Sequence, residues 1–468
     1  MTYSLNFISV ELALVLGALL ILMAAVFGAG RKTLGFAALA TVMIAIFRLP
    51  ATMPPGYPVF DGMLVSDTFG YGMRLFILLT VAMVVLMSLA YAWPQDEDMG
   101  EFYFFILVAT VALNLAACAG NLAMVYLAVE TLSIVSYVLA GYFKRDILST
   151  EAGVKYFLFG ALSTGLMLYG ISLAYGLFGT LDMSFIGSRI AAGDAHGPAL
   201  VVAAVLILAG LAFKASLVPF HMWVADVYEG APWPVAAFLS VTSKALGFVL
   251  LARIFFSNAV VAVPFWSGVA PVIAILTMTI GNLAAFHQNS VKRMLAFSSV
   301  AQAGYIFAAM ALGQAGLSTA FFYIAIYAFM NMGAFAAAAF LSPADAQLEA
   351  YRGLGRRAPV MAFLFSVFLL SLAGLPPLAG FMAKFFVISA AVEARDYILA
   401  GAVVLNSILG FFYYLKVIKA MYFDDETSVR ECLVPWLGYL LVGGCAWGVI
   451  FLAIHPQAIL DILALMFV

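Results

Sequence analysis

Four lysines lie within long apolar stretches of the chain, where a charged side chain is a candidate for function. They are Lys214, Lys244, Lys384 and Lys416. A charge at the centre of a membrane-spanning helix costs about 2.5–3.5 kcal/mol or more, so it usually marks a functional site. Lys416 is close to the end of its stretch, where its side chain could instead extend to the membrane surface. The sequence favours the first three lysines and leaves both interpretations of Lys416 open.

Glu130 is an acidic residue near the middle of another apolar stretch, in the segment Tyr126–Ser136. A carboxylate at that depth needs a partner or must hold a proton. Lys214 is the natural candidate, and the pair would be either a static packing contact or a device for proton transfer. We expect the second, because burial favours a neutral lysine whereas a nearby carboxylate favours a charged one.

A proline interrupts the helical pattern five residues after Lys214. Pro219 lacks an N–H and displaces the carbonyl of Ala215, so we expect a local break beside the lysine. Irregular backbone at membrane depth is tolerated where it is buried in protein or lines a wet cavity. His221 follows two residues later and could extend a proton relay near neutral pH, or simply pack beside Trp223.

Hydroxyl groups precede Lys244 in the sequence, at Ser240, Thr242 and Ser243. They suit a hydrated path through the protein. A row of lysines joined by water would pass protons along the plane of the membrane, with openings to opposite faces for entry and exit. The chain carries no P-loop that could supply the energy, so we expect the energy to come from elsewhere.

The composition is that of a polytopic helical membrane protein with almost no aqueous domain. Of 468 residues, 66% are hydrophobic and 9% are charged. The net charge of −2 gives no indication of nucleic-acid binding. The three cysteines, Cys118, Cys432 and Cys445, form no CxxC motif. We therefore expect no cofactor and no metal on this chain.

Hydropathy predicts an all-α fold with about fourteen membrane-spanning helices. The predicted spans are residues 9–29, 33–49, 72–92, 102–118, 122–142, 156–178, 199–222, 235–256, 265–286, 294–312, 318–341, 361–390, 398–420 and 434–454. The longest connection, 50–71, contains three prolines and predicts an irregular extramembrane loop. The apolar tail after His455 is expected to lie against the bundle.

The lysine spacing indicates two inverted five-helix repeats. Lys384 follows Lys214 by 170 residues and Lys416 follows Lys244 by 172. Five spans is an odd number, so the second copy must enter the membrane from the opposite side. Each repeat would contain a broken helix, the second one interrupted at Pro376 and Pro377. The predicted units are an N-terminal three-helix segment (1–101), the two repeats (102–260 and 261–422), and a C-terminal helix with its tail (423–468).

Lysine and arginine are concentrated in the loops that follow odd-numbered spans. Twelve lie there, against five in or beside the loops that follow even-numbered spans. Because cytoplasmic loops carry an excess of these residues, we expect the odd-numbered loops to be cytoplasmic. Both termini would then face the non-cytoplasmic side.

Three stretches and the Glu130 segment resemble the antiporter-like subunits of proton-pumping NADH–quinone oxidoreductase, respiratory complex I. The stretches are Lys214–Pro232, Val291–Ser299 and Gly374–Phe381. With the number of spans, the resemblance covers most of the chain. Within this family the sequence looks most like the N-type subunits. Lys384 stands where M-type subunits have a glutamate, and the lateral helix of the L-type subunits is missing.

The resemblance implies a proton relay that begins with an ion pair between Glu130 and Lys214. Lys244 would pass protons through the centre and Lys384 would be the terminal site. NADH oxidation and quinone reduction would take place in other subunits. The implied partners are M-type, K-type and J-type membrane subunits and the lipid bilayer, in a bacterial inner membrane. One position departs from the pattern. Relatives often have histidine where this chain has Gln302, which cannot titrate but can order water.

Two other interpretations stay open from the sequence. The same superfamily motifs occur in subunits of multi-subunit Na⁺/H⁺ antiporters, and Lys384 in place of a glutamate is the feature that argues against this class. The chain could instead be a structural scaffold that holds other pump modules in line. Intact pumping after substitution of all the buried charges would favour the scaffold.

Overall fold

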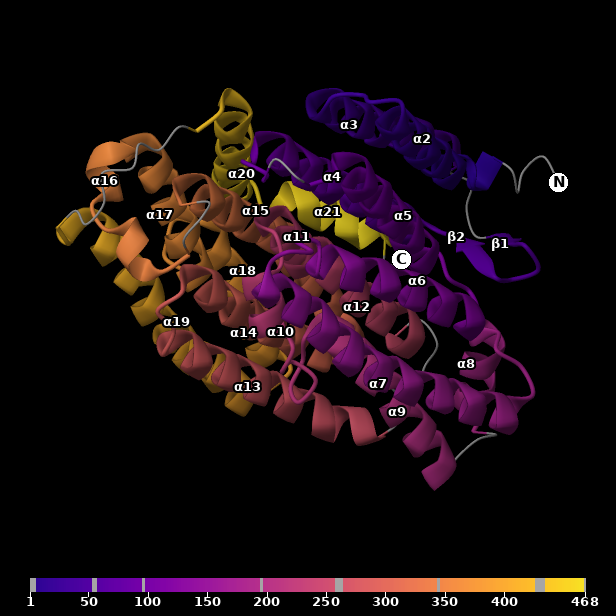
Figure 1. Ribbon diagram of the computed structural model, residues 1–468. Coiled ribbons are helices and arrows are strands. Elements are labelled where there is room, and N and C mark those ends of the chain that lie inside the picture. The colour runs from indigo at the N-terminus through magenta and orange to yellow at the C-terminus, as the bar shows by residue number, and fades with distance from the viewer. Residues whose placement is uncertain are drawn as a thin grey trace.

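The computed structural model describes residues 6–52, 57–94, 97–193, 197–256, 264–342, 346–425 and 434–466. Within these ranges, thirteen helical segments are long and apolar enough to cross a membrane. They pack side by side in a single bundle (Figure 1). The prediction of an all-α polytopic membrane protein is confirmed, and each predicted span contains a helix or a broken pair of helices.

The first half of the chain begins at the bundle edge and ends in its centre. Its helices are α2 (Ser9–Val26), α3 (Arg31–Arg48), α4 (Thr68–Ala90), α5 (Met99–Ala117), α6 (Leu122–Ala140), α7 (Ile147–Phe178), α8 (Met183–Ala191), α9 (Pro198–Ala215), α10 (Val224–Gly230), α11 (Trp233–Phe238) and α12 (Lys244–Leu251). A 3₁₀ turn, η1 (Leu49–Thr52), follows α3. Two π-helical segments, η2 (Leu239–Ser243) and η3 (Ala252–Phe256), flank α12.

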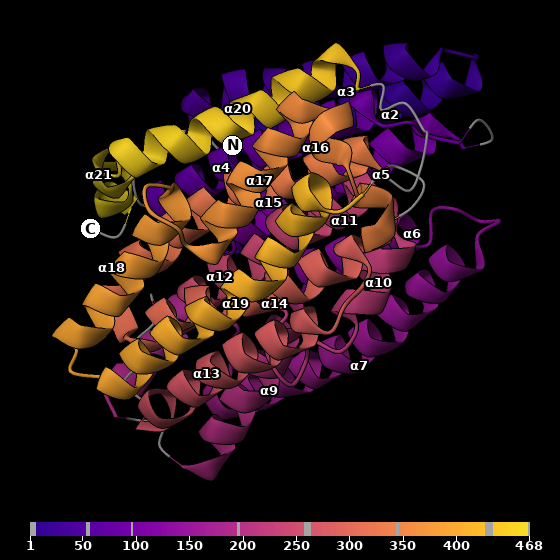
Figure 2. The same cartoon turned by 90° about the vertical axis from the view of Figure 1, so that its left-hand side faces the viewer.

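The second half of the chain packs around α11 and α12, on the side away from α2 and α3 (Figure 2). Its helices are α13 (Pro264–Phe286), α14 (Val291–Ala311), α15 (Leu317–Leu341), α16 (Leu354–Arg357), α17 (Pro359–Ala373), α18 (Ala379–Glu393), α19 (Tyr397–Phe423), α20 (Trp436–Ile454) and α21 (Gln457–Met466), with 3₁₀ turns η5 (Gly313–Gly316) and η6 (Leu348–Tyr351). The prediction that the tail lies on the bundle is confirmed, because α21 packs against α4 and α15.

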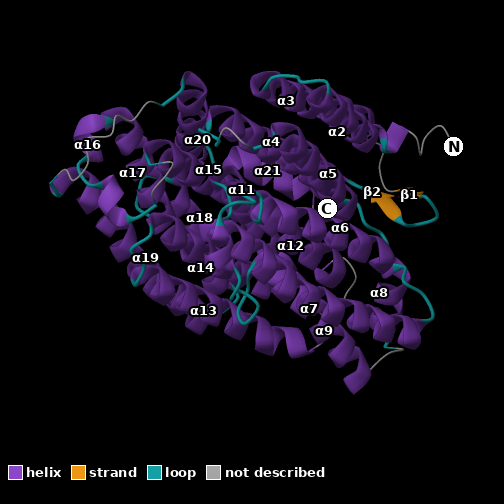
Figure 3. Cartoon of the chain, viewed as in Figure 1, coloured by secondary structure: helices purple, strands orange, loops and turns teal. Residues whose placement is uncertain are grey.

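The connection between α3 and α4 is more regular than predicted. It forms a two-stranded antiparallel sheet, β1 (Tyr57–Val59) and β2 (Leu64–Ser66), shown in orange in Figure 3. The turn between the strands passes through Gly62, at φ +84°. The hairpin also bonds to the loop after α5, since Val65 N–H donates to the Cys118 carbonyl at 2.8 Å. Local hydrogen bonds therefore order a segment expected to be irregular.

The hairpin marks one of the two faces of the bundle. This hairpin face also carries α8, the start of α4 and the end of α12. Arg253, in η3 directly after α12, binds Asp67, the residue before α4, through two hydrogen bonds of 2.7 and 2.9 Å. We call the opposite face the basic face. It lies at the other end of the 32-residue helix α7, where Lys155 and Arg293 lie.

Both predicted breaks are present, but the first begins earlier than expected. The span predicted to reach residue 222 leaves the helical path after Ala215, because Ser216 takes a left-handed conformation at φ +61°. Pro219 lies inside the turn and not at its start. In the second break, α17 ends at Ala373 and Gly374 is left-handed at φ +87°. Helix α18 resumes at Ala379.

Candidate functional site

Lys244 lies in the centre of the bundle and is 1% exposed. Its Nζ donates to two oxygens of Ser299 on α14, the carbonyl at 2.7 Å and Oγ at 2.8 Å. The Ser240 hydroxyl, one turn earlier, binds other groups. Ser240 Oγ donates to the Ala237 carbonyl at 2.9 Å and accepts from Asn331 Nδ2 at 2.8 Å. The π-helical turn before Lys244 is thus anchored to α15, and the ammonium group faces α14.

Lys384 is 4% exposed and folds back from α18 onto the end of α17. Its Nζ donates to the carbonyls of Leu372 at 3.0 Å and Ala373 at 2.9 Å. These carbonyls belong to the last turn of α17, which the break leaves without helical partners. A helix C-terminus carries a partial negative charge, so it is a favourable site for an ammonium group. The Tyr305 ring lies 4.7 Å from the same Nζ.

Gln302 sits beside Lys384 at the centre of a buried hydrogen-bonded set. Its Nε2 donates to the Leu372 carbonyl at 3.1 Å and to Tyr414 OH at 3.4 Å, while its Oε1 accepts from Tyr323 OH at 2.6 Å. Ser298 Oγ is hydrogen-bonded to Tyr414 OH. We call Gln302, Tyr323, Tyr414 and Ser298 the Gln302 group. All of its members are neutral, so it can order water or pass a proton along hydroxyls without holding a charge.

Two consecutive serines of α14 bring the two lysine sites together. Ser299 binds Lys244, and Ser298 belongs to the Gln302 group, which shares a backbone carbonyl with Lys384. Adjacent residues of α14 therefore belong to the surroundings of both lysines. The sequence does not signal this, because the partners lie tens of residues apart in the chain.

Lys214 occupies the last turn of α9, just before the first break, and is 2% exposed. Its Nζ has no hydrogen-bond partner among the residues that the structure describes. It lies 5.7 Å from the Tyr156 ring and 5.8 Å from the Phe213 ring. A buried ammonium group without a partner is costly in free energy, so it must be solvated by water or lose its proton. Either requirement suits a residue that exchanges protons.

Glu130 is half-buried and does not touch Lys214. Its Oε1 accepts from Thr164 Oγ1 at 3.3 Å, and its Oε2 has no hydrogen-bond partner within the described ranges. Glu130 is on α6 and Lys214 on α9, and α7 packs against both helices. The two residues therefore lie in the same region of the bundle, but the structure shows no ion pair between them.

In the described part of the chain, several buried polar atoms in the segments around Lys214 and Lys244 have no hydrogen-bond partner. They are Tyr156 OH, Ser216 Oγ, Trp223 Nε1, Tyr228 OH, Thr242 Oγ1 and Tyr327 OH. The rings of three of these residues form a row in space. The Trp223 ring stacks on the Tyr156 ring with centroids 4.3 Å apart, and its centroid is 6.0 Å from that of the Tyr228 ring. Buried polar atoms of this kind usually bind ordered water. The set marks a route suited to water between the two lysines.

The two secondary candidates have different surroundings. His221 lies in the first break, and its Nδ1 is buried without a partner. Lys416 is on the basic face, where its Nζ donates to the Gln288 carbonyl at 3.0 Å and to Asn289 Oδ1 at 3.1 Å. Lys416 therefore secures the loop between α13 and α14 and lies apart from the row of buried lysines.

Asp226 and Glu229 form ion pairs on the basic face. Arg293 binds Asp226 at 2.8 Å and Glu229 at 2.6 Å, and Lys155 binds Asp226 at 2.6 Å. Burial raises the pKa of Asp226, but hydrogen bonds from Lys155 and Arg293 outweigh it and leave the pKa below its ordinary value. The network joins α7, α10 and α14 just beyond the first break.

In the part of the chain that the structure describes, no group of three His, Cys, Asp or Glu side chains could hold a metal ion. Cys118 and Cys445 are buried free thiols. Cys432 lies outside the described residues.

Residues 119–410 match the family described as NADH:quinone oxidoreductase/Mrp antiporter, TM. The NADH-quinone oxidoreductase subunit N of Trichlorobacter lovleyi is 41% identical over 86% of this chain and 84% of its own length. The subunit N of Rhodospirillum rubrum is 36% identical over 96% of this chain and 94% of its own. Helices α2–α5 precede the matched range.

Solved structures share the fold over nearly the whole chain. A chain of respiratory complex I from Thermus thermophilus matches with a TM-score of 0.83 at 30% identity, covering 97% of this chain and 98% of that one. A chain of the Mrp complex from Dietzia sp. DQ12-45-1b matches with a TM-score of 0.88 at 22% identity, covering 100% and 97%. At that identity, the second likeness concerns the fold alone.

Proposed function

The chain belongs to the NADH:quinone oxidoreductase/Mrp antiporter transmembrane family, and on this premise we propose that its buried lysines conduct protons across the membrane. It is a subunit of the N type, in the membrane arm of a proton-translocating NADH-quinone oxidoreductase. In this proposal the redox reactions take place on other subunits. The relay on this chain consists of Lys214, Lys244 and Lys384, with Glu130 at its beginning.

The observation that carries this proposal is the absence of a contacting carboxylate at each lysine. Within the described ranges, Lys214 has no hydrogen-bond partner, Lys244 binds a serine, and Lys384 binds two carbonyls. A lysine kept for static packing is normally paired, because an unpaired buried charge costs several kcal/mol. Lysines held with neutral partners can take up and release a proton without breaking an ion pair.

The chemistry begins at Glu130 on α6, which α7 separates from Lys214 on α9. A change in the position or protonation of this carboxylate changes which form of the lysine is favoured. The proton then passes to Lys244 by way of the water-binding polar atoms around Tyr156 and Tyr228. Ser299, Ser298 and the Gln302 group lead on to Lys384. Moving one charge through 100 mV requires about 2.3 kcal/mol, which the partner subunits must supply.

The test is the proton-to-electron ratio of the assembled complex in membrane vesicles oxidising NADH. Lys244→Met keeps most of the side-chain volume and removes the titrating group, so the ratio should fall. The matched control is Lys419→Met, because the Lys419 side chain is 70% exposed and pairs with Asp424 on the surface. An unchanged ratio in Lys214→Met, Lys244→Met and Lys384→Met alike would refute the proposal and favour the scaffold.

The Na⁺/H⁺ antiporter alternative has weaker support. The relatives that are 36% and 41% identical are subunit N proteins, whereas the likeness to the Mrp chain, at 22% identity, concerns the fold. Pumping that needs no sodium would separate the two classes.

For the assembly we propose M-type, K-type and J-type membrane subunits as neighbours, in the inner membrane of a bacterium. The basic face would be cytoplasmic, and both termini would be on the hairpin side. The excess of lysine and arginine in the odd-numbered loops supports this orientation. Periplasmic or cytoplasmic reporter fusions at the chain ends would test it.

We also propose that residues 102–260 and 261–422 are inverted repeats. The two breaks support this division, since each begins with a left-handed residue after a helix end, Ser216 in one and Gly374 in the other. The lysines differ in register: Lys214 precedes its break, whereas Lys384 follows its break and folds back to it. The proposed boundary between the repeats lies outside the described residues.

A further inference from the structure

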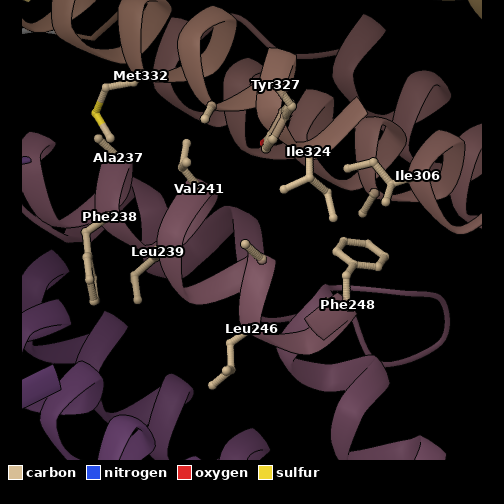
Figure 4. Close-up of a cluster of buried hydrophobic side chains, with 14 of the residues drawn as sticks. Ala237, Phe238, Leu239, Val241, Leu246, Phe248, Ile306, Ile324, Tyr327 and Met332 are labelled. Atoms are coloured by element: carbon tan, nitrogen blue, oxygen red, sulfur yellow. The ribbon is translucent and has the colours of Figure 1, made fainter. Parts of the chain in front are cut away.

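Mostly apolar side chains line a small pocket against Lys244 and Ala245. They come from α4, η2, α12, α14 and α15, and are Phe76, Val241, Phe248, Ile306, Ile324 and Tyr327. We call these six residues the plug. Figure 4 shows Phe248, Ile306 and Ile324 directed toward one another beside the helix of Lys244. Four of the six, all but Phe76 and Tyr327, have purely aliphatic or aromatic side chains that are 3% exposed or less.

The plug extends from Lys244 toward the hairpin face. Phe248 is one helical turn beyond Lys244, on the way to Arg253 at the end of that helix. Ile306 is in the last third of α14, which begins on the basic face, and Ile324 is in the first third of α15, which begins on the hairpin face. Phe248, Ile306 and Ile324 therefore lie on the hairpin side of Lys244, whereas Val241, three residues before it, lies toward the basic face.

Charged groups lie beyond the plug at the hairpin face. Arg253 is nine residues after Lys244, roughly 13 Å along a helix. It holds Asp67 through two hydrogen bonds, and the Asp67 side chain is 31% exposed, so this pair reaches the surface. A buried ammonium group and a solvent-accessible ion pair are thus aligned on one helix, with apolar side chains between them.

We propose that the plug is the closed gate of a proton route from Lys244 along α12 to the hairpin face. This inference rests on the proposed function and adds an exit that bypasses Lys384. Apolar constrictions block water and protons by remaining dry, and they open when a small change in packing lets water in. Tyr327 supplies the polar atom for that change, because its hydroxyl is buried at the plug and meets the geometric criteria for a hydrogen bond with none of the described residues.

One wall of the proposed gate comes from the N-terminal part of the chain. Phe76 comes from α4, which precedes the family match at residues 119–410. Helix α4 is also bonded to the far end of the route through Asp67. A shift of α4 relative to α12 would move one wall of the plug and the exit pair together.

The test is passive proton leak through the assembled complex in liposomes, with an imposed pH gradient, a pH-sensitive dye and no NADH. Ile306→Thr/Ile324→Thr adds two hydroxyls to the plug and shortens both side chains, which leaves room for water. The leak should rise severalfold over wild type, and Lys244→Met in the same background should abolish the increase. Ile326→Thr is the control, since Ile326 is equally buried on α15 but does not line the plug.

A wild-type leak in the double variant, or a raised leak that persists with Lys244→Met, would overturn the gate. The single variant Ile324→Thr gives the same test if the double variant fails to assemble. The proposed function has a separate readout, the proton-to-electron ratio of Lys244→Met. A lowered ratio there with no leak in the threonine variants would reject the gate and leave the relay intact.

Discussion

Lys384 and Gln302 donate hydrogen bonds to the same backbone oxygen, that of Leu372, at 3.0 and 3.1 Å. The shared carbonyl belongs to the end of α17, where the break leaves it without a helical N–H. The break thus supplies a fixed acceptor for a titratable lysine and for a neutral amide at once. Any movement of the break should therefore change the hydrogen bonds of both side chains at once.

Gln302→Leu should lower the proton-to-electron ratio while NADH oxidation continues. Leucine has a similar volume but leaves Tyr323 OH without its acceptor, and an unsatisfied buried group costs about 1–3 kcal/mol. The measurement is the ratio in vesicles, with assembly checked on native gels. Gln302→His should retain pumping, because histidine can also donate and accept hydrogen bonds. Equal loss in both variants would contradict a role for the hydrogen-bonded group.

Ser299→Ala should slow pumping without abolishing it. The variant removes one of the two Lys244 acceptors, Oγ at 2.8 Å, and keeps the carbonyl at 2.7 Å. A hydrogen bond to a charged group contributes about 1.5–3 kcal/mol, so a decrease in rate of roughly tenfold is expected. The control is Ser366→Ala, whose hydroxyl donates only to the Ala362 carbonyl of its own helix. A wild-type pumping rate for Ser299→Ala would contradict the prediction.

The spans, the breaks and the key lysines could be predicted because each is a local anomaly in the sequence. An apolar run, a proline within it and a lysine within it can all be recognised from neighbouring residues. Lys384 and Glu130 were identified in this way. The division into two repeats is harder to predict from the lysines. Lys214 precedes its break, whereas Lys384 follows its break, so the two residues do not occupy equivalent positions.

The partners of these residues could not be predicted because they depend on packing between distant segments. Ser299 meets Lys244 across 55 residues of sequence, and Arg253 meets Asp67 across 186. The first break began at Ser216 and not at Pro219, because a serine adopted a backbone conformation that its sequence does not signal. Glu11 was missed as a buried charge because it lies near the end of its helix.

Asp226→Asn should destabilise the junction of α7, α10 and α14 equally at every pH between about 6 and 9. The pKa of Asp226 lies below its ordinary value of 3.8, because hydrogen bonds from Lys155 and Arg293 outweigh the effect of burial. A lowered pKa stabilises the fold above the unfolded value, and this is lost only as pH falls through the folded pKa. Thermal inactivation of wild type and variant is the measurement. A difference that varied with pH in this range would contradict the prediction.

Arg74→Leu should strongly destabilise the N-terminal segment. Arg74 is 1% exposed and binds both carboxylate oxygens of Glu11 at 2.9 Å, joining α4 to α2. Removing one partner leaves a buried charge uncompensated, which costs about 3–5 kcal/mol. The yield and thermal stability of the assembled complex are the measurements. The control is Lys144→Ala, which breaks an exposed pair with Glu101 and should cost about 1 kcal/mol or less.

The double variant Glu11→Leu/Arg74→Leu decides what the buried pair is for. Replacing both partners of a buried ion pair by apolar side chains is often neutral or stabilising, so stability should recover. If proton pumping recovers with it, the pair only fixes α2 against α4. If stability recovers but pumping does not, these charges act on the route that α4 helps to line. A double variant as unstable as Arg74→Leu would show that the pair is not the cause of the loss.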